Sequence, residues 1–490
     1  MTAVRVAGFP GVAAVVADQP GIPAPRAVAL HGGTQEEAME PPRILVVGGG
    51  FAGVECVRRL ERLLTPDEAS ITLVAARNYQ LYLPLLPQVA AGMLTPQSVA
   101  VSLRRLLRRT RVAPGAALGV DLDAKVCVVR GLSGRIRVEP YEYLVLAPGS
   151  VTRTFDIPGL AEHARGMKTL AEAAYLRDHV IAQLDIAAAA PERDEQEARL
   201  QFVVVGGGYS GTETAAALHR LTSAAAGRYP GLDPHAIKWH LVDIAPKLMP
   251  ELGDDLGEKA TDLLRQRGID VSLGVSVAEA DAETVRLTDG RVLPCHTLIW
   301  TAGVRPSPLI DTLGAETVRG RLKVTENMDV PERPGVFAVG DAAAVPDISK
   351  GDGAVCPPTA QHAQRQGRAV ARNVAATLRG QPMEPYQHRD MGLVVDLGGT
   401  DAVANPLGVP LTGLPAQAVT RGYHMVALHT SVARARVLTN WVLNATSGDD
   451  YVRMGFLANQ PATLRELEHT DAYLSADQLR SYTRPSDVPG

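Results

Sequence analysis

Cysteine is scarce in this sequence. Only four occur among the 490 residues, at Cys56, Cys127, Cys295 and Cys356. No two of them have the C-x-x-C spacing that is typical of a redox-active disulfide or of a metal site. The pattern favours unpaired thiols in a reducing compartment, predicts no metal site and argues against a dithiol–disulfide mechanism.

Long apolar runs and blocks of one charge are also missing. No stretch reaches the length of about 20 apolar residues that a membrane-spanning helix needs. The 49 basic and 53 acidic residues nearly cancel and leave a net charge of −4. This balance gives no reason to expect a nucleic-acid partner, and we predict a cytoplasmic protein.

The chain is long and has ordinary apolar content. With 46% hydrophobic residues it can bury sizeable cores, and its 490 residues suggest about three domains. Residues 1–42 stand apart because they are rich in Ala, Val, Gly and Pro. Proline and glycine interrupt this stretch and little charge precedes it, so we predict a flexible N-terminal extension rather than a secretion signal.

A glycine-rich turn follows the apolar run at residues 43–47. Gly48, Gly50 and Gly53 have the G-x-G-x-x-G spacing of a dinucleotide-binding turn, and a helix-permissive run comes directly after them. The first glycine permits the tight turn, the second lets the backbone approach a pyrophosphate, and the third lets the helix lie close to the strand. The free N–H groups at the helix start then face the phosphates.

The same pattern occurs a second time at residues 202–213. Gly206, Gly208 and Gly211 again follow an apolar run, and Glu213 comes two residues later, where we expect the first turn of a helix. One such pattern is weak evidence, but two with the same spacing and context predict an α/β protein with two Rossmann-like domains.

The strands that follow the two turns end differently. In this fold an acidic residue there binds a ribose hydroxyl. The strand after the first glycine turn ends in Ala75-Ala76 and offers no acid. We therefore expect the backbone, a water, Arg77 or Asn78 to hold that ribose. The second ends in Asp243, which suits the free 2′-hydroxyl of NAD(H) and would repel the 2′-phosphate of NADP(H).

Three further stretches complete the pattern. Apolar runs lead into small-residue turns at Ala147-Pro148-Gly149 and at Gly303, and a third ends in Gly340-Asp341.

Residues 78–92 are apolar and interrupted by proline, so we expect a packed loop there. The run from Ala416 to Asn444 can form a helix.

Together these motifs resemble the flavoprotein pyridine nucleotide–disulfide oxidoreductases and, within them, the type II NADH dehydrogenases, which are NADH:quinone oxidoreductases. The resemblance covers about residues 43–444. It is carried by the first glycine turn and by four other stretches, namely Tyr82–Ala90, Trp300–Arg305, Gly340-Asp341 and Pro357–Gln361.

The resemblance implies that the first domain binds FAD and the second binds NADH. Its domains would be 43–155 together with 316–380 for FAD, 156–315 for NAD(H), inserted in the FAD domain, and a smaller α+β domain at 381–490. It makes Glu213 and Gln361 catalytic, places Gln361, Gln364 and Arg365 at the quinone, and makes Asp341 the ligand of the FAD ribityl chain. The remaining expected cofactor-binding residues are Gly48, Gly50, Phe51, Ala52, Gly53, Arg77, Pro84, Ala147, Gly149, Gly206, Gly208, Gly211, Asp243 and Gly303.

Two departures from the family pattern keep other functions open. Ala75 replaces the ribose acid, and Arg365 replaces a glutamine. A sulfide:quinone oxidoreductase would need a second cysteine beside Cys356, for which the sequence offers no convincing partner. A non-catalytic flavin-binding redox sensor is the other alternative.

The C-terminal run bears on partners and location. Arg421, Arg434 and Arg436 are interleaved with apolar and aromatic residues between Ala416 and Asn444. This composition is compatible with a helix lying on the inner face of the cell membrane, and equally with a helix packed on the protein itself or in a homodimer.

Overall fold

The computed structural model describes residues 40–351, 353–388, 391–455, 462–467 and 473–483 of the chain. Contacts group Pro41–Gly490 into one compact unit. The predicted extension at residues 1–42 lies almost wholly outside the described residues, so its flexibility stays a prediction.

The first glycine turn follows β1 (Arg43–Val47), which is buried from Ile44 onward. It pairs in parallel with β2 (Ser70–Ala75) on one side and β8 (Tyr143–Leu146) on the other. A strand that is covered on both faces needs apolar residues at successive positions, which explains the unbroken run in the sequence.

Seven strands form the first sheet, in the order β21-β8-β1-β2-β5-β6-β7. The other members are β5 (Arg111–Asp121), β6 (Val126–Gly131), β7 (Ile136–Pro140) and β21 (Val336–Ala338). Because β21 comes late in the chain and pairs in parallel with β8, the first sheet is built from two separated stretches.

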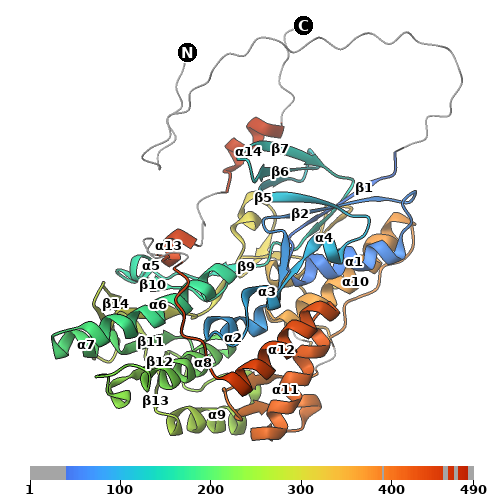
Figure 1. The fold of residues 1–490 in the computed structure, drawn as a ribbon. Helices are drawn as coiled ribbons and strands as arrows, with labels where there is room; N and C mark the ends of the chain where they lie inside the picture. Colours follow the sequence, from blue (N-terminus) through green and yellow to red (C-terminus); the bar gives the residue numbers. More distant parts are fainter. Residues whose placement is uncertain (1–39, 352, 389–390, 456–461, 468–472, 484–490) are drawn as a thin grey trace, which may run out of the picture. The chain divides into compact units, whose positions relative to one another are not determined.

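The second sheet is formed by residues between those two stretches (Figure 1). Its order is β10-β17-β11-β12-β13, and every pair is parallel. The strands are β10 (Ala164–Arg165), β11 (Gln201–Val205), β12 (Lys238–Asp243), β13 (Ile269–Leu273) and β17 (Thr297–Trp300). The predicted α/β class, with one Rossmann-like domain inserted in another, is confirmed. The residue boundaries given above for the domains stay predictions.

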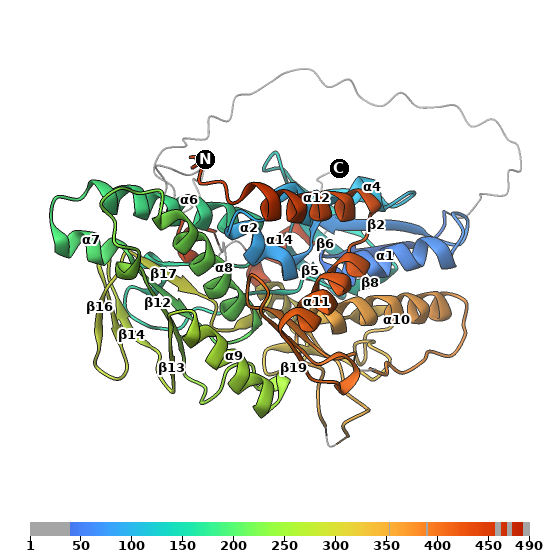
Figure 2. The ribbon, with the colours of Figure 1, turned by 60° about the horizontal axis from the view of Figure 1, so that its bottom comes forward.

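Helices cover these sheets (Figures 1 and 2). The longer ones are α1 (Phe51–Leu63), α6 (Leu170–Ala189), α8 (Tyr209–Ala226), α9 (Asp254–Gln266) and α10 (Ala360–Leu378). The short ones are α3 (Pro96–Val99), α4 (Leu103–Leu106), α5 (Leu160–His163), α7 (Arg193–Arg199), α13 (Leu464–Leu467) and α14 (Ala476–Thr483).

Short strands connect the larger elements. They are β3 (Tyr79–Leu81), β4 (Ala100–Ser102), β9 (Ser150–Thr152), β14 (Val277–Ala280), β15 (Thr284–Leu287), β16 (Val292–Pro294), β18 (Val304–Pro306), β19 (Thr317–Val318), β20 (Arg321–Lys323) and β22 (Ala343–Ala344). Of these, β9 and β18 pair in antiparallel fashion and join the segments that follow Gly149 and Gly303.

The loop predicted at residues 78–92 is wrong in part. It contains β3, a 3₁₀ turn at Leu83–Leu85 and the helix α2 (Leu86–Ala90). Pro84 and Pro87 lie in the first turns of these helical segments, where a missing N–H breaks no hydrogen bond. Proline therefore starts helices here instead of excluding them.

The C-terminal part is α+β, as predicted. Three antiparallel strands, β23 (Val394–Asp396), β24 (Ala402–Ala404) and β25 (Leu411–Thr412), pack with the helix α11 (Gly413–Ala427). A second helix, α12 (Ser431–Ser447), follows. The helical run predicted from Ala416 to Asn444 is thus divided, because the Thr430 side chain caps α12 by accepting the Ala433 N–H at 3.2 Å. Among the described helices, none is long and apolar enough to cross a membrane.

Helices α1 and α10 lie side by side (Figure 2). Their close packing depends on Gly367. A Cβ atom at Gly367 would lie 2.3 Å from the backbone oxygen of Ala52. Since Ala52 belongs to the first glycine turn, this contact fixes the position of α10 beside that turn.

We expect Gly367→Ala to destabilise the protein by about 1–3 kcal/mol, because the added methyl forces the two helices apart. Gly422→Ala is the matched control: Gly422 also lies inside a helix, is exposed, and has nothing within 4 Å of the place where a Cβ would stand. The control should be neutral or stabilising by up to about 1 kcal/mol. Denaturant unfolding measures both, and equal effects would contradict this account of the packing.

Candidate functional site

The first glycine turn has no room for side chains at two of its glycines. Gly48 has φ +118°, and a Cβ there would lie 2.0 Å from the Ala147 oxygen. A Cβ at Gly53 would lie 1.9 Å from the Gly48 oxygen. Gly50 differs, because a Cβ added to it would meet nothing within 4 Å. The turn is closed on its inner side and open at Gly50, which is where a pyrophosphate would approach.

The second turn repeats this geometry. Gly206 has φ +111°, and a Cβ at Gly211 would lie 1.8 Å from the Gly206 oxygen. Gly208 is open in the same way as Gly50. A Cβ at Gly149 (φ +74°) or at Gly303 (φ +93°) would also meet nothing within 4 Å. Each Rossmann-like domain therefore has a second open stretch of backbone at the matching place.

Asp243 lies beside the second turn. Its carboxylate accepts hydrogen bonds from the backbone N–H groups of Gly207 and, at 2.6 Å, Ala245. At the matching place beside the first turn lies the buried methyl group of Ala75. A Cβ added at Gly49 would be 2.9 Å from it. Arg77 is exposed nearby, and its predicted contact with a ribose stays untested.

Asp341 is held by residues that the sequence patterns did not indicate. Ser150 Oγ donates to Asp341 Oδ2 at 2.6 Å, and Lys168 Nζ donates to Ser150 Oγ at 2.9 Å. The Gly340 N–H donates to Gln366 Oε1 at 2.8 Å. Ser150 directly follows Gly149, and Gln366 directly follows the predicted quinone residue Arg365, so both had a local signal. Lys168 had none.

Gln80 of β3 is another residue that the sequence patterns did not indicate. It is 2% exposed, and neither its amide oxygen nor its amide nitrogen has a hydrogen-bond partner in the described chain. Leaving a buried amide unpaired costs about 1–3 kcal/mol. A bound polar molecule would remove that cost, so this residue and the two open turns fit a nucleotide cofactor.

Glu213 is the fifth residue of α8, beyond the first turn where we predicted it. Its Oε1 accepts the Asp396 N–H at 3.0 Å. Burial raises the pKa of Glu213 to about 8. The Asp396 carboxylate adds to this rise, and the hydrogen bond from the Asp396 N–H opposes it. At pH 7 the side chain is therefore mainly a neutral acid.

A small cavity brings three parts of the chain together at Glu213. Residues that follow the first glycine turn, residues of α8 and residues of the C-terminal part all contribute to its wall. The lining residues are Pro84, Pro87, Gln88, Met93, Glu213, Ala217, Asp396, Gly398 and His424. Asp396 connects Gln88 with Glu213. Its Oδ2 accepts a hydrogen bond from Gln88 Nε2 at 2.9 Å, and its N–H donates to Glu213.

The structure does not bring the predicted quinone residues to this cavity. Gln361 Nε2 donates to the Gly392 oxygen at 2.8 Å, and Arg365 Nη1 lies 3.2 Å from His388 Nδ1. Gln364 is partly buried on the same helix. All three lie at the start of α10, which Thr359 caps through the His362 N–H at 3.3 Å.

Comparison with known proteins agrees with this geometry. Residues 42–367 match the model of the pyridine nucleotide-disulphide oxidoreductase family. A type II NADH:quinone oxidoreductase of Mycobacterium tuberculosis is 31% identical over 84% of this chain and 90% of its own length. The chain belongs to the pyridine nucleotide-disulphide oxidoreductase family. A type II NADH:quinone oxidoreductase of Staphylococcus aureus is 29% identical over 77% of this chain and 92% of its own length.

Solved structures show the same fold. An NDH2 of Plasmodium falciparum in complex with NADH aligns with a TM-score of 0.78 at 18% identity, covering 84% of this chain and 99% of that one. A sulfide:quinone oxidoreductase of Aquifex aeolicus aligns with a TM-score of 0.61 at 20% identity, covering 84% and 96%. The predicted family, an FAD- and NAD(H)-dependent oxidoreductase, is confirmed.

The raised pKa of Glu213 predicts a pH-dependent stability. Below about pH 4.5 the carboxyl is protonated in both the folded and the unfolded chain. As the pH rises towards about 8 the unfolded chain loses this proton first, so the folded state loses about 1.4 kcal/mol for each unit of raised pKa. Glu213→Gln should remove this loss.

The measurement is denaturant unfolding of both proteins at pH 5 and pH 8. The variant should gain stability relative to the wild type between these values. A constant difference would show that the pKa of Glu213 is ordinary.

Proposed function

We propose that this protein oxidises NADH through bound FAD and reduces a quinone, with Glu213 supplying a proton to the quinone. The observation that carries the proposal is the desolvated, mainly neutral carboxyl of the partly exposed Glu213, in a cavity shared by all three parts of the chain. The FAD would accept hydride from NADH and pass the electrons on. The side chains bind, orient and exchange protons.

The two turns have separate roles in this proposal. The first, with Gly48, Gly50 and Gly53, holds the FAD pyrophosphate, and Asp341 holds the ribityl chain. The second, with Gly206, Gly208 and Gly211, holds NADH, and Asp243 accepts a ribose hydroxyl. Support comes from the open faces of Gly50 and Gly208 and from the position of Asp243 at the turn.

Glu213 suits the second half of the reaction. Reducing a quinone to a quinol consumes two electrons and two protons. A group with a pKa of about 8 is protonated at neutral pH and can still release its proton, as general acid catalysis requires. An ordinary glutamate would be ionised and could not donate.

A sulfide:quinone reaction fits less well. It needs a pair of reactive thiols, and all four cysteines are free and buried. Burial raises the pKa of the Cys356 thiol to about 11, and it raises the pKa values of the other three as well. Thiolate is therefore disfavoured at each position. The similarity to a sulfide:quinone oxidoreductase is one of fold.

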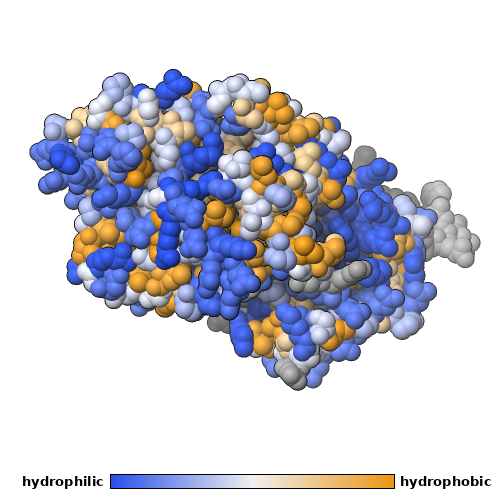
Figure 3. All heavy atoms as spheres, turned by 90° about the horizontal axis from the view of Figure 1, so that it is seen from below, coloured by the Kyte–Doolittle hydropathy of each residue, from blue (hydrophilic) through white to orange (hydrophobic). Residues whose placement is uncertain are grey.

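We propose further that α11 and α12 touch a membrane surface peripherally. Large apolar side chains are exposed on both helices: Leu414, Val426, Leu438, Val442 and Leu443. Figure 3, which shows the side of the molecule that carries α9 and α11, has separate apolar patches among polar ones. A homodimer contact through the same helices is the alternative.

Asp243 should make the enzyme prefer NADH to NADPH. We expect Asp243→Ala to narrow the ratio of the two kcat/KM values by about tenfold for each 1.4 kcal/mol of lost discrimination. Asp262→Ala, an exposed aspartate on α9, is the control. Equal kcat/KM values for both nucleotides in the wild type would place Asp243 away from the ribose.

The central test measures both half-reactions by stopped-flow absorbance of the flavin, with NADH and then a soluble quinone. In Glu213→Gln we expect flavin reoxidation by quinone to slow by about 10²–10³-fold, with flavin content unchanged. Glu258→Gln, exposed on α9, serves as control. A wild type that reacts with NADH but not with any quinone would overturn the proposed function.

A further inference from the structure

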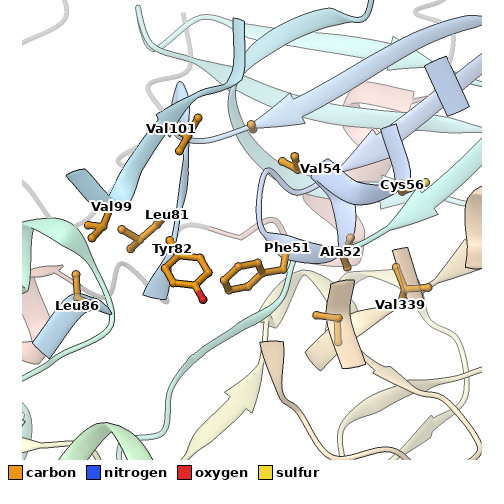
Figure 4. Close-up of a cluster of buried hydrophobic side chains, with 14 of the residues drawn as sticks. Phe51, Ala52, Val54, Cys56, Leu81, Tyr82, Leu86, Val99, Val101 and Val339 are labelled. Carbon is orange, nitrogen blue, oxygen red and sulfur yellow. The ribbon is translucent and has the colours of Figure 1, made fainter. Parts of the chain in front are cut away.

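His424 of α11 is buried in the wall of the cavity that contains Glu213. It is 3% exposed, and its Nδ1 lies 3.1 Å from the hydroxyl of Tyr82. The two rings meet edge to face with centroids 5.8 Å apart, and Tyr82 meets Phe51 in the same way at 6.0 Å. Phe51 starts the helix of the first glycine turn, and Figure 4 shows its ring beside that of Tyr82. Through Tyr82, His424 of α11 is therefore connected to that turn.

The Tyr82–His424 hydrogen bond fixes the form of the imidazole. Burial lowers the pKa of His424 to about 4 and raises the pKa of Tyr82, so both groups are neutral at pH 7. A neutral phenol can donate to an imidazole nitrogen. With Tyr82 as the donor, Nδ1 accepts and the ring proton is on Nε2, so the imidazole in the cavity wall keeps one N–H donor.

The cavity can hold an oxygen atom that accepts this hydrogen bond. Its volume is about 10 Å³, the space that one water needs. Glu213 lines the same cavity, and its ionised form would be near enough to raise the pKa of Tyr82. A neutral carboxyl and a neutral imidazole therefore line one small space.

We propose that His424, held as its Nε2–H tautomer by Tyr82, donates a hydrogen bond during quinone reduction, either to the quinone carbonyl oxygen or to a water that bridges to it. Negative charge develops on that oxygen as the quinone receives its electrons. Of the two protons that the quinol gains, one would arrive with the electron pair from the reduced flavin. Glu213 supplies the other by breaking its O–H bond and is left as a carboxylate, while His424 keeps its proton throughout. This role rests on the proposed function and adds a residue to it.

The test compares His424→Phe, His424→Gln and Tyr82→Phe with the wild type in the flavin-containing enzyme. Each is assayed for flavin reduction by NADH, for reoxidation by a soluble quinone and for reoxidation by ferricyanide, which takes electrons without protons. We expect His424→Phe to slow reoxidation by quinone by about 10–100-fold. His424→Gln, which keeps a donor, and Tyr82→Phe, which frees the tautomer, should lose less.

The other two reactions separate this role from a structural one. Flavin reduction and ferricyanide reoxidation should stay within about twofold of wild type in all three variants, as should every reaction of the exposed control His235→Phe. A rise in quinone KM with the fall in kcat would indicate direct contact, and a fall in kcat alone would indicate the bridging water.

Two results would overturn the proposal. One is an unchanged rate with quinone in His424→Phe, and the other is an equal loss with quinone and ferricyanide. In both cases the wild type still reduces quinone, so the proposed function survives. A wild type inactive with quinone would instead remove the proposed function itself.

Discussion

The nucleotide-binding geometry depends on one steric constraint, the contact between the start of a helix and the strand before it. At both glycine turns the third glycine lies against the backbone oxygen of the first, with no space for a Cβ atom. This contact holds the helix start over the strand end and leaves the middle glycine open. A side chain at Gly53 or Gly211 would move the helix, and the direction of its N–H groups would change with it.

The same constraint extends beyond the turns. Gly367 lets α10 approach Ala52, and α10 supplies Gln366, whose side chain accepts the Gly340 N–H beside Asp341. Close backbone packing thus places the side chain that holds the Gly340 N–H. The first Rossmann-like domain keeps this packing although its strand β2 ends in Ala75 instead of an acid.

At the junction of the three parts, the controlling effect is desolvation. Glu213, His424 and Tyr82 all have pKa values that burial shifts towards the neutral form. Neutral donors in a site of low dielectric cost less to bury than charges, and they can hydrogen-bond an oxygen whose charge is developing. Asp396 links the groups through Gln88 and the Glu213 carboxyl.

The sequence by itself determined both glycine turns, the parallel strands beside them, the acid at Asp243 and the family. These features are local, because turn sterics and strand burial act over a few neighbouring residues. Only the tertiary structure decided which distant groups meet. His424 lies 342 positions from Tyr82 and Lys168 lies 18 from Ser150, and no spacing rule covers such pairs. The pKa of Glu213 likewise depends on burial by other elements, which a linear pattern does not contain.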